Sequence, residues 1–448
     1  MNEWWIEPMR RAFAGRAVVL AGAMGSSWTE HIELLRAVGV NKLLVIATEG
    51  RGAGPLPDVP TLIVEPASGL SQMERIHGAD RTLHEPTSDM VAAIEAFDPT
   101  GEAVVVATFL STATQLVGRA ILSFRRPEWL ALEDKVVVDA FWDRAGVERQ
   151  PSRVVALDAV ARAATDVDRG DGTVWAADAR EGFHGGATQT YWVRDDASRD
   201  RALAGLSSVC DSVRVMPFLE GVPCSIHGIV LPDGVAVLRP VEMVTLRRGH
   251  VFSYAGCATY WDPDPVAREQ MRIVATRAGD RLREEVDFRG TFTVDGVVSS
   301  DGFWPTELNP RFGAGIMTIA RGAGIPMVLV NDLIVGGHDI GRTALDLEAD
   351  VVTHGDARRG GGTWQGGLDI ETELESVPVQ YVDGTWSWAR SGGPIDGRVT
   401  TGSGFIRCLY DQASTPIGPS TGPRAAAFWQ FAATELGTAT AGLTPARA

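Results

Sequence analysis

The stretch "DGFWPTELNPRFGAG", residues 301–315, places a carboxylate, an amide and a guanidinium at every second position, as Glu307, Asn309 and Arg311. Side chains two residues apart lie on the same face of a β-strand. Such a face does not belong in a core, because burying unpaired polar and charged groups is costly. The stretch therefore predicts a strand that presents a charged site.

The preceding residues predict that this strand is one half of an antiparallel hairpin. "FRGTFTVDGVV" (288–298) reads as the first strand and "SSDG" (299–302) as the turn. With Asp301 as the centre of the turn, Asp295 and Glu307 face each other across the two strands. Opposed side chains on one face are about 5 Å apart at Cβ, so the two carboxylates repel unless a cation lies between them. A register slip of one residue would separate them, and a merely solvated polar face is the alternative interpretation.

The oxygen atoms on this face predict a site for a hard cation. Two carboxylates and an amide, from Asp295, Glu307 and Asn309, are ligands that suit Mg²⁺, with Mn²⁺ as the second choice. Arg311 would present a bidentate fork to phosphate or carboxylate oxygens.

Composition narrows the class of protein. The chain has 448 residues, 45% of them apolar and 22% charged, and a net charge of −16, which argues against nucleic acid or an anionic membrane as a partner. Its four cysteines form no CxxC motif, no apolar run reaches the ~18 residues of a membrane span, and the N-terminus does not resemble a secretory signal. We expect a soluble protein of the cytoplasm and, by base rate, a homodimer.

The N-terminal residues predict a doubly wound domain in a mixed α/β fold. "RAVVLAGAM" (16–24) reads as a buried strand, and "NKLLVIATEG" (41–50) as a second strand after an intervening helix, which is a β-α-β opening. The loop "LAGAMGSS" lacks the GxGxxG fingerprint of dinucleotide binding. A Rossmann dehydrogenase is therefore disfavoured.

The middle of the chain predicts a helix and then a flap. The segment "RPEWLALEDKVVVDAFWDRAGVER" (126–149) reads as one helix, with Trp129, Leu132, Val136 and Phe141 at helical spacing. "TVWAADAREGFHGGATQTYWV" (173–193) follows, which reads as two strands joined by a glycine-containing, mobile flap.

Four motifs together resemble the ATP-grasp superfamily. "TELNPRFGAG" resembles the ExNxR signature, and Asp295 stands where that family places its first metal-binding acid. "EDKVVV" (133–138) resembles the Asp-Lys that starts the nucleotide-binding region. "AREGFHGGATQ" (179–189) resembles the flap over the phosphates, and "VMPFLEGVPCSI" (215–226) resembles the hinge that holds adenine.

The resemblance implies an ATP-grasp fold with a Rossmann-like N-terminal domain (1–125), two ATP-grasp subdomains (126–215 and 216–345) and a C-terminal β-rich extension (346–448). It also implies roles for residues of this chain. Lys135 and Arg311 would be catalytic, and Asp295, Glu307 and Asn309 would hold the metal. The implied ATP-binding residues are Lys135, Arg180, His184, Gly185, Gly186, Pro217, Phe218, Leu219 and Glu220.

The sequence departs from the family pattern at one position. Most members carry a second lysine on the strand before the flap, where this chain has Ala176 and Ala177. Arg180, His184 or another basic group is expected to substitute for it, or nucleotide binding is weaker than usual. Only two lysines, Lys42 and Lys135, occur in the whole chain.

Substrate contacts are expected from Glu242, Arg247, Arg248 and Arg311. The alternative is a solvent-facing acid for Glu242 and a solvated turn for Arg247 and Arg248. The resemblance implies an ATP-dependent carboxylate–amine ligase that uses ATP and Mg²⁺ to join a carboxylate to an amino acid or peptide amine. Some segments, such as "LRPVEMVTLRRG", are similar to peptide ligases of natural-product biosynthesis. The alternative is an ATP-binding sensor of the same fold without ligase chemistry.

Overall fold

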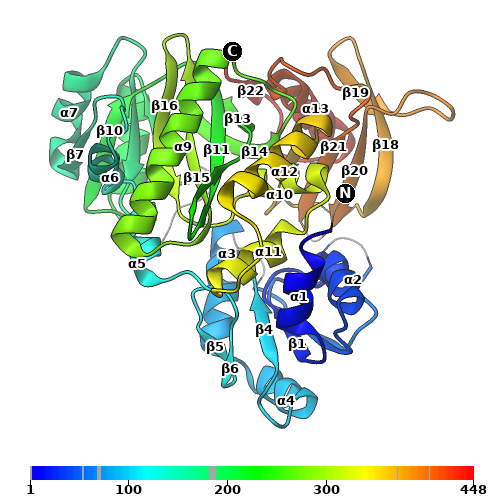
Figure 1. The fold of residues 1–448 in the computed structure, drawn as a ribbon. Helices are drawn as coiled ribbons and strands as arrows, with labels where there is room; N and C mark the ends of the chain where they lie inside the picture. The colour runs from blue at the N-terminus through cyan, green and yellow to red at the C-terminus, as the bar shows by residue number, and fades with distance from the viewer. Residues whose placement is uncertain are drawn as a thin grey trace.

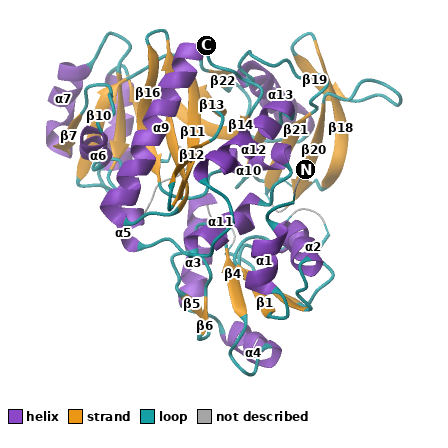
Figure 2. Cartoon of the chain, viewed as in Figure 1, coloured by secondary structure: helices purple, strands orange, loops and turns teal. Residues whose placement is uncertain are grey.

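The computed structural model describes residues 3–52, 55–67, 72–180, 188–370, 372–402 and 404–447. A small parallel sheet lies in the N-terminal part of the chain, and a large antiparallel sheet takes up most of the remainder (Figures 1 and 2). This mixed α/β architecture agrees with the prediction.

The N-terminal sheet has the strand order β3-β2-β1-β4, and its strands run parallel. Its strands are almost continuously apolar, as expected for a sheet covered on both faces. Helices α1 and α2 share one core cluster with it, whereas α3 and α4 share another. The elements are α1 (Ile6–Phe13), β1 (Ala17–Ala21), α2 (Thr29–Ala37), β2 (Lys42–Ala47), β3 (Thr61–Ile63), α3 (Gln72–His84), α4 (Ser88–Phe97) and β4 (Val104–Ala107).

Sixteen strands among the described residues form the large sheet. Its main path is β16-β15-β11-β13-β14-β17-β21-β20-β18-β19. The strands are β7 (Arg153–Ala156), β8 (Thr173–Ala177), β9 (Thr190–Val193), β10 (Ser212–Pro217), β11 (Val222–Leu231), β12 (Gly234–Val237), β13 (Val241–Arg248), β14 (Val251–Ala258), β15 (Gly290–Ser299), β16 (Gly302–Asn309), β17 (Gly361–Gln365), β18 (Leu374–Val382), β19 (Thr385–Trp388), β20 (Gly397–Gly402), β21 (Phe405–Tyr410) and β22 (Thr444–Pro445).

The C-terminal residues continue this sheet. β17 pairs with β14, and β22 pairs with β13, so the strands after residue 346 add to the sheet that carries the hairpin. The helices packed around the large sheet are α6 (Val138–Ala145), α7 (Val160–Val167), α8 (Asp196–Leu206), α9 (Pro265–Val286), α10 (Ala314–Ala323), α11 (Met327–Val335), α12 (Ala344–Ala357) and α13 (Gly422–Glu435).

The helix predicted over residues 126–149 is wrong in its middle and ends earlier, at Ala145. The chain forms α5 (Pro127–Leu130), a 3₁₀ turn (Ala131–Glu133) and then α6. Asp134 breaks the run, because its side chain accepts a hydrogen bond of 3.1 Å from the N–H of Val136 and so favours a turn. Lys135 therefore lies in a turn between two helices.

The hairpin predicted around the flap is confirmed for its strands, since β8 and β9 pair antiparallel with Thr173 opposite Val193. Residues 181–187 of the flap lie outside the described residues.

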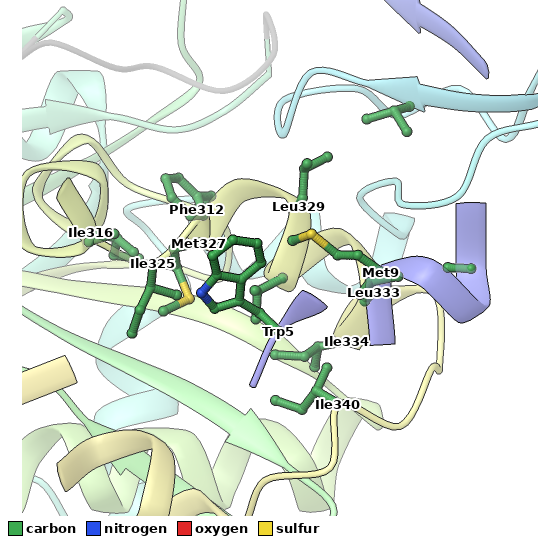
Figure 3. Packing of buried hydrophobic residues seen from close by; sticks show 14 of the residues in the cluster. Trp5, Met9, Phe312, Ile316, Ile325, Met327, Leu329, Leu333, Ile334 and Ile340 are labelled. Carbon is green, nitrogen blue, oxygen red and sulfur yellow. The ribbon is translucent and has the colours of Figure 1, made fainter. Parts of the chain in front are cut away.

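A shared core joins the N-terminal part to the helices that follow the hairpin. Trp5, which precedes α1, and Met9 of α1 pack in one cluster with Phe312 and with side chains of α10 and α11 (Figure 3). In the described part of the chain no single helix has the length and apolar composition to cross a membrane. Only α10 and α11 taken together reach that length and composition, and the two helix axes are bent by 117° with respect to each other.

Candidate functional site

A cavity of about 360 Å³ lies where the β8–β10 strands face β11, β13, β14, β15 and β16, which is within the range of small-molecule sites. It is lined by ten of the residues predicted from the sequence. These are Lys135, Pro217, Phe218, Leu219, Glu220, Arg247, Asp295, Glu307, Asn309 and Arg311.

The pairing of Asp295 with Glu307 is confirmed, although the route to it was not the predicted one. Ser299 pairs with Gly302, so the turn is centred between Ser300 and Asp301, not on Asp301. A regular ladder from that turn would set Thr306 opposite Asp295. A β-bulge leaves Thr306 unpaired and restores Glu307 to the position opposite Asp295. Pro305 beside the bulge is tolerated because β16 ends the sheet path.

The carboxylate pair has the electrostatics of a cation site. Burial and the neighbouring charge of Glu307 raise the pKa of Asp295, while Ser225, Arg311 and Lys135 act in the opposite direction. The Ser225 hydroxyl donates a 2.6 Å hydrogen bond to Asp295, and the Asn309 amide donates one of 2.9 Å. Lys135 Nζ lies 3.6 Å from a Glu307 oxygen. A cation between the carboxylates would relieve the repulsion that raises this pKa.

The donor set fits a hard ion that keeps part of its coordination for other ligands. No group of three or more His, Cys, Asp and Glu side chains in metal-binding arrangement occurs among the described residues. Two carboxylates and one amide oxygen are therefore what this site offers. Mg²⁺ or Mn²⁺, completed by water and phosphate oxygens, suits such a set.

Arg311 is held in place by an acid that the sequence reasoning missed. Its Nε lies 3.3 Å from the buried carboxylate of Glu133, and its Nη2 donates a 2.9 Å hydrogen bond to the Asn309 side-chain oxygen. Glu133 also accepts a hydrogen bond from Arg125. Glu133 therefore fixes the fork of Arg311 next to the carboxylate pair.

Arg214 is a second residue that the sequence reasoning missed. It lies on β10 directly opposite Ala176 of β8, and both residues line the cavity. Its Nη1 donates a 2.7 Å hydrogen bond to the carbonyl oxygen of Thr306, and its Nη2 a 2.6 Å one to Asp139. A buried cation therefore stands next to the position where a lysine was expected. Its signal in the sequence was weak: one arginine inside the apolar run "SVRVMP".

The other end of the cavity is the predicted hinge, Pro217–Glu220. The Phe218 ring stacks on Trp192 of β9, with ring centroids 3.9 Å apart. Glu220 accepts hydrogen bonds of 2.8 and 3.1 Å from Arg247 and one of 2.8 Å from the Arg447 N–H. Although burial acts to raise it, these bonds lower the pKa of Glu220. Arg247, predicted to bind substrate, lines the cavity and pairs with the hinge acid Glu220.

Three predicted residues are absent from the cavity lining. Both carboxylate oxygens of Glu242 accept hydrogen bonds from Ser420, Thr421 and Gly422 at the start of α13, so the prediction that it contacts substrate is replaced by a structural role. Arg248 is exposed and donates to the carbonyl of Ala439. Arg180 is 39% exposed and pairs with Asp211 at 2.7 Å. His184, Gly185 and Gly186 lie outside the described residues.

Comparison with solved structures identifies the fold. A biotin carboxylase from Campylobacter jejuni superposes with a TM-score of 0.59 at 13% identity, covering 98% of this chain and 94% of that one. An N5-carboxyaminoimidazole ribonucleotide synthetase solved with ADP superposes with a TM-score of 0.51 at 12% identity, covering 89% of this chain and 94% of that one. An L-amino acid ligase from Bacillus licheniformis superposes with a TM-score of 0.50 at 14% identity, covering 97% of this chain and 99% of that one.

The fold is therefore the ATP-grasp fold, as the motifs predicted. No protein-family model matches the chain, and no curated protein sequence matches it significantly.

Proposed function

We propose that this protein is an ATP-dependent ligase that joins a carboxylate to an amine through an acyl phosphate. The observation that carries the proposal is the register of β15 and β16. It sets Asp295 opposite Glu307, with Asn309 and Arg311 beside them, in a cavity whose other end is an aromatic hinge. A site that only bound nucleotide would not require a fixed arginine beside the carboxylate pair.

The chemistry follows from the poor reactivity of a carboxylate. An oxygen of the substrate carboxylate attacks the γ-phosphorus of ATP, the bond to the β-γ bridging oxygen breaks, and ADP leaves. The amine then attacks the acyl carbon, loses a proton and expels phosphate. Bound Mg²⁺ would neutralise phosphate charge, held by Asp295, Glu307 and Asn309.

Residues of the chain perform the remaining tasks in this proposal. The hinge Pro217–Glu220 binds the adenosine end, and Lys135 steadies a phosphate group. Arg311, oriented by Glu133, stabilises the oxyanion that forms when the amine attacks. Such electrostatic stabilisation lowers the activation free energy by about 3 kcal/mol.

The amine and the acid are proposed to be amino acids or peptides. The segments "HGGATQTYWV", "LRPVEMVTLRRG" and "FTVDGVVSSDGFWPTELNPR" resemble the peptide ligase of pheganomycin biosynthesis, and the L-amino acid ligase is among the solved structures with this fold. A role in peptide natural-product biosynthesis, in the cytoplasm, is consistent with these resemblances.

The test is ADP release by the full chain with ATP, Mg²⁺ and pairs drawn from a panel of amino acids and short peptides. We expect release that depends on both an acid and an amine, a product of matching mass, and loss of both in Glu307→Gln. Glu375→Gln, an exposed acid outside the cavity, is the matched control. ADP release without an amide product in any pair would contradict the proposal.

One observation favours the alternative of an ATP-binding sensor. Ala176 occupies the cavity wall where a lysine was expected, and a weakened phosphate site would suit binding without turnover. Tight ATP binding without amine-dependent ADP release would favour the sensor.

A further inference from the structure

A second cavity, of about 340 Å³, lies in the C-terminal part of the large sheet. It is built mainly on β20 and β21, which β15, β11, β13, β14 and β17 separate from β16 of the hairpin (Figure 1). It shares no lining residue with the cavity of the candidate site. The function proposed above therefore gives this second cavity no role.

Arg407 of β21 brings an unpaired charge to the second cavity. The buried arginines among the described residues each form an ion pair with a carboxylate, and they are Arg119, Arg125, Arg214, Arg239, Arg247 and Arg424. Arg407 is partly buried, yet its guanidinium has no such partner among the described residues, and its Nε is buried without a hydrogen bond. Its two Nη groups are neither buried nor paired, so they are open to the cavity that Arg407 lines.

The surroundings of Arg407 make this charge unfavourable. Burial lowers the pKa of Arg407, and the positive charge of Arg321 on α10 acts in the same direction, while Glu30 opposes them. Glu30 is already 3.8 Å from Arg321, so it does not neutralise Arg407. Arginine nevertheless stays protonated in proteins, and a partly desolvated, unpaired charge is costly. An anionic group bound to the open Nη atoms would offset that cost.

The neighbouring strand completes a site for a carboxylate. Thr400 of β20 lies directly opposite Arg407, and both line the cavity. Arg398, two residues before Thr400, lies on the same face and is anchored by a 3.1 Å hydrogen bond from its Nη1 to the Ser376 carbonyl. A planar guanidinium beside a hydroxyl matches the two oxygens of a carboxylate.

The same face carries an apolar residue and then an acid. Arg407, Leu409 and Asp411 alternate along β21 and the residue after it, and all three line the cavity. The N–H of Asp411 donates a 2.9 Å hydrogen bond to the Asp396 carbonyl, so the extended pairing continues to this position. Four residues separate Arg407 from Asp411, which is about 13 Å along a strand. The row therefore runs from cation through apolar surface to anion.

This order of charges selects the kind of ligand. Asp411 and Glu375 of β18 are both in the lining, and they disfavour a multiply charged anion such as a nucleoside triphosphate. A zwitterion with its carboxylate at Arg407 and its ammonium group at Asp411 matches both ends. Three extended residues span about 10 Å, which suits a short peptide between two side chains that reach inward.

We propose that this second cavity binds a short peptide, with its C-terminal carboxylate on Arg407 and Thr400 and its ammonium group toward Asp411. Apolar side chains of the peptide rest on Leu409 and on Ile395, which is 38% exposed and also lines the cavity. The site goes beyond the proposed ligase chemistry and does not depend on it.

Trp364 provides a local probe of the second cavity. It lies opposite Arg407 on the neighbouring strand β17. Its ring packs edge-on against Tyr254, which lines the cavity of the candidate site, with ring centroids 6.2 Å apart. The indole N–H resonance of Trp364, assigned by its absence in Trp364→Phe, should shift when a peptide binds beside Arg407.

Titration calorimetry of the full chain, without nucleotide, tests the site. The probes are tri-L-alanine and L-alanyl-L-leucyl-L-alanine, the C-terminal amide and the N-acetyl form of each, and inorganic phosphate. We expect at least one peptide to bind, its amide to bind at least tenfold more weakly, as loss of a hydrogen bond to a charged group requires, and its N-acetyl form to bind more weakly as well.

Variants of Arg407 connect the binding to the second cavity. Arg407→Met should weaken peptide binding at least tenfold, and Arg407→Lys, which keeps the charge without the fork, should fall between. Arg390→Met, an exposed arginine outside the cavity, is the matched control and should bind as the wild type does. Because Arg407→Met removes an unpaired charge, its Tm should not fall. If that variant does not fold, the Trp364 resonance of the wild type still reports the site.

Absence of binding by both peptides, equal binding of peptide and amide, unchanged affinity in Arg407→Met, an unmoved Trp364 resonance, or phosphate binding as tight as that of the peptide would each overturn the site. Peptide binding that is lost in Glu307→Gln and kept in Arg407→Met would place the peptide in the cavity of the candidate site and would also overturn it. Peptide binding at Arg407 without any ADP release would refute the ligase and leave this site.

Discussion

The guanidinium of Arg214 donates a 2.7 Å hydrogen bond to the carbonyl oxygen of Thr306, the unpaired residue of the β-bulge in β16. The next residue in the chain is Glu307, whose place opposite Asp295 depends on that bulge. Arg214 is itself anchored by Asp139 of α6 at 2.6 Å. A cation on β10 thus positions one of the two opposed acids on the far side of the cavity.

Replacing Arg214 should therefore change the Mg²⁺ dependence of the proposed ligase activity. Lysine keeps the charge but cannot bridge Thr306 and Asp139 with the same planar fork. In Arg214→Lys we expect the Mg²⁺ concentration for half-maximal ADP release to rise about tenfold, as loss of a ligand's supporting hydrogen bond does. Arg180→Ala, which removes the cation first expected to replace the lysine, is the matched control. A metal requirement equal in Arg214→Lys and wild type would refute the positioning role.

Glu133 should matter for turnover more than for nucleotide binding. Glu133→Gln leaves Arg125 and Arg311 without their shared counter-ion, and breaking a buried ion pair costs about 3–5 kcal/mol. We expect kcat to fall at least tenfold while the KM for ATP changes less than twofold, together with a lower Tm. Steady-state kinetics and a thermal scan measure both. Glu285→Gln, from a more exposed pair with Arg144, should show neither effect.

Glu220 and Glu242 should separate nucleotide binding from stability. Glu220→Gln removes the counter-ion of Arg247, which packs on the hinge rings of Trp192 and Phe218. We expect ATP to bind about tenfold more weakly, as for a lost charge-assisted hydrogen bond, with acid binding unchanged.

Glu242→Gln should instead lower the stability of the fold and leave ATP binding unchanged. Its carboxylate accepts four hydrogen bonds before α13, so we expect a loss of about 1–3 kcal/mol of unfolding free energy and normal ATP affinity. Calorimetry and urea unfolding measure the two quantities. A raised KM for substrate in a fully stable Glu242→Gln would restore its predicted substrate role.

Asp332 makes the stability of the fold depend on pH. It lies on α11 and is buried, with 1% of its surface exposed. Burial raises the pKa of Asp332 to about 7, with the Ser123 hydroxyl acting to lower it. Because the folded pKa exceeds the unfolded value of about 4, the folded chain holds this proton more tightly. The stabilisation is complete below pH 4 and is lost as the pH rises through 7.

Asp332→Asn should remove this dependence. We expect its advantage in unfolding free energy over the wild type to grow by up to about 1.4 kcal/mol per pH unit between pH 5 and 7. Urea unfolding at pH 5, 6, 7 and 8 measures it, with the exposed Asp369→Asn as the control. Parallel curves for Asp332→Asn and wild type would show that Asp332 is ionised in the folded protein throughout.

The sequence predicted the elements whose patterns are local. Unbroken apolar runs identified the parallel strands, and period-two spacing identified the face that carries Glu307, Asn309 and Arg311. The break at Asp134 was missed because the apolar spacing of Trp129 to Phe141 continues across it, while a single side-chain hydrogen bond redirects the backbone. Glu242 was misread because its partners lie about 180 residues later in the chain.

By itself, then, the sequence determined the fold class, the two strands of the hairpin and the kinds of atom at its charged face, because side-chain alternation follows from backbone geometry. Only the tertiary structure decided which cations lie beside that face and that His227 packs against Gly315 at the start of α10. Arg214 reaches Thr306 across 92 residues of sequence, and no periodicity records a contact between distant segments. The bulge that sets Glu307 opposite Asp295 likewise depends on how three separate elements pack around one carbonyl oxygen.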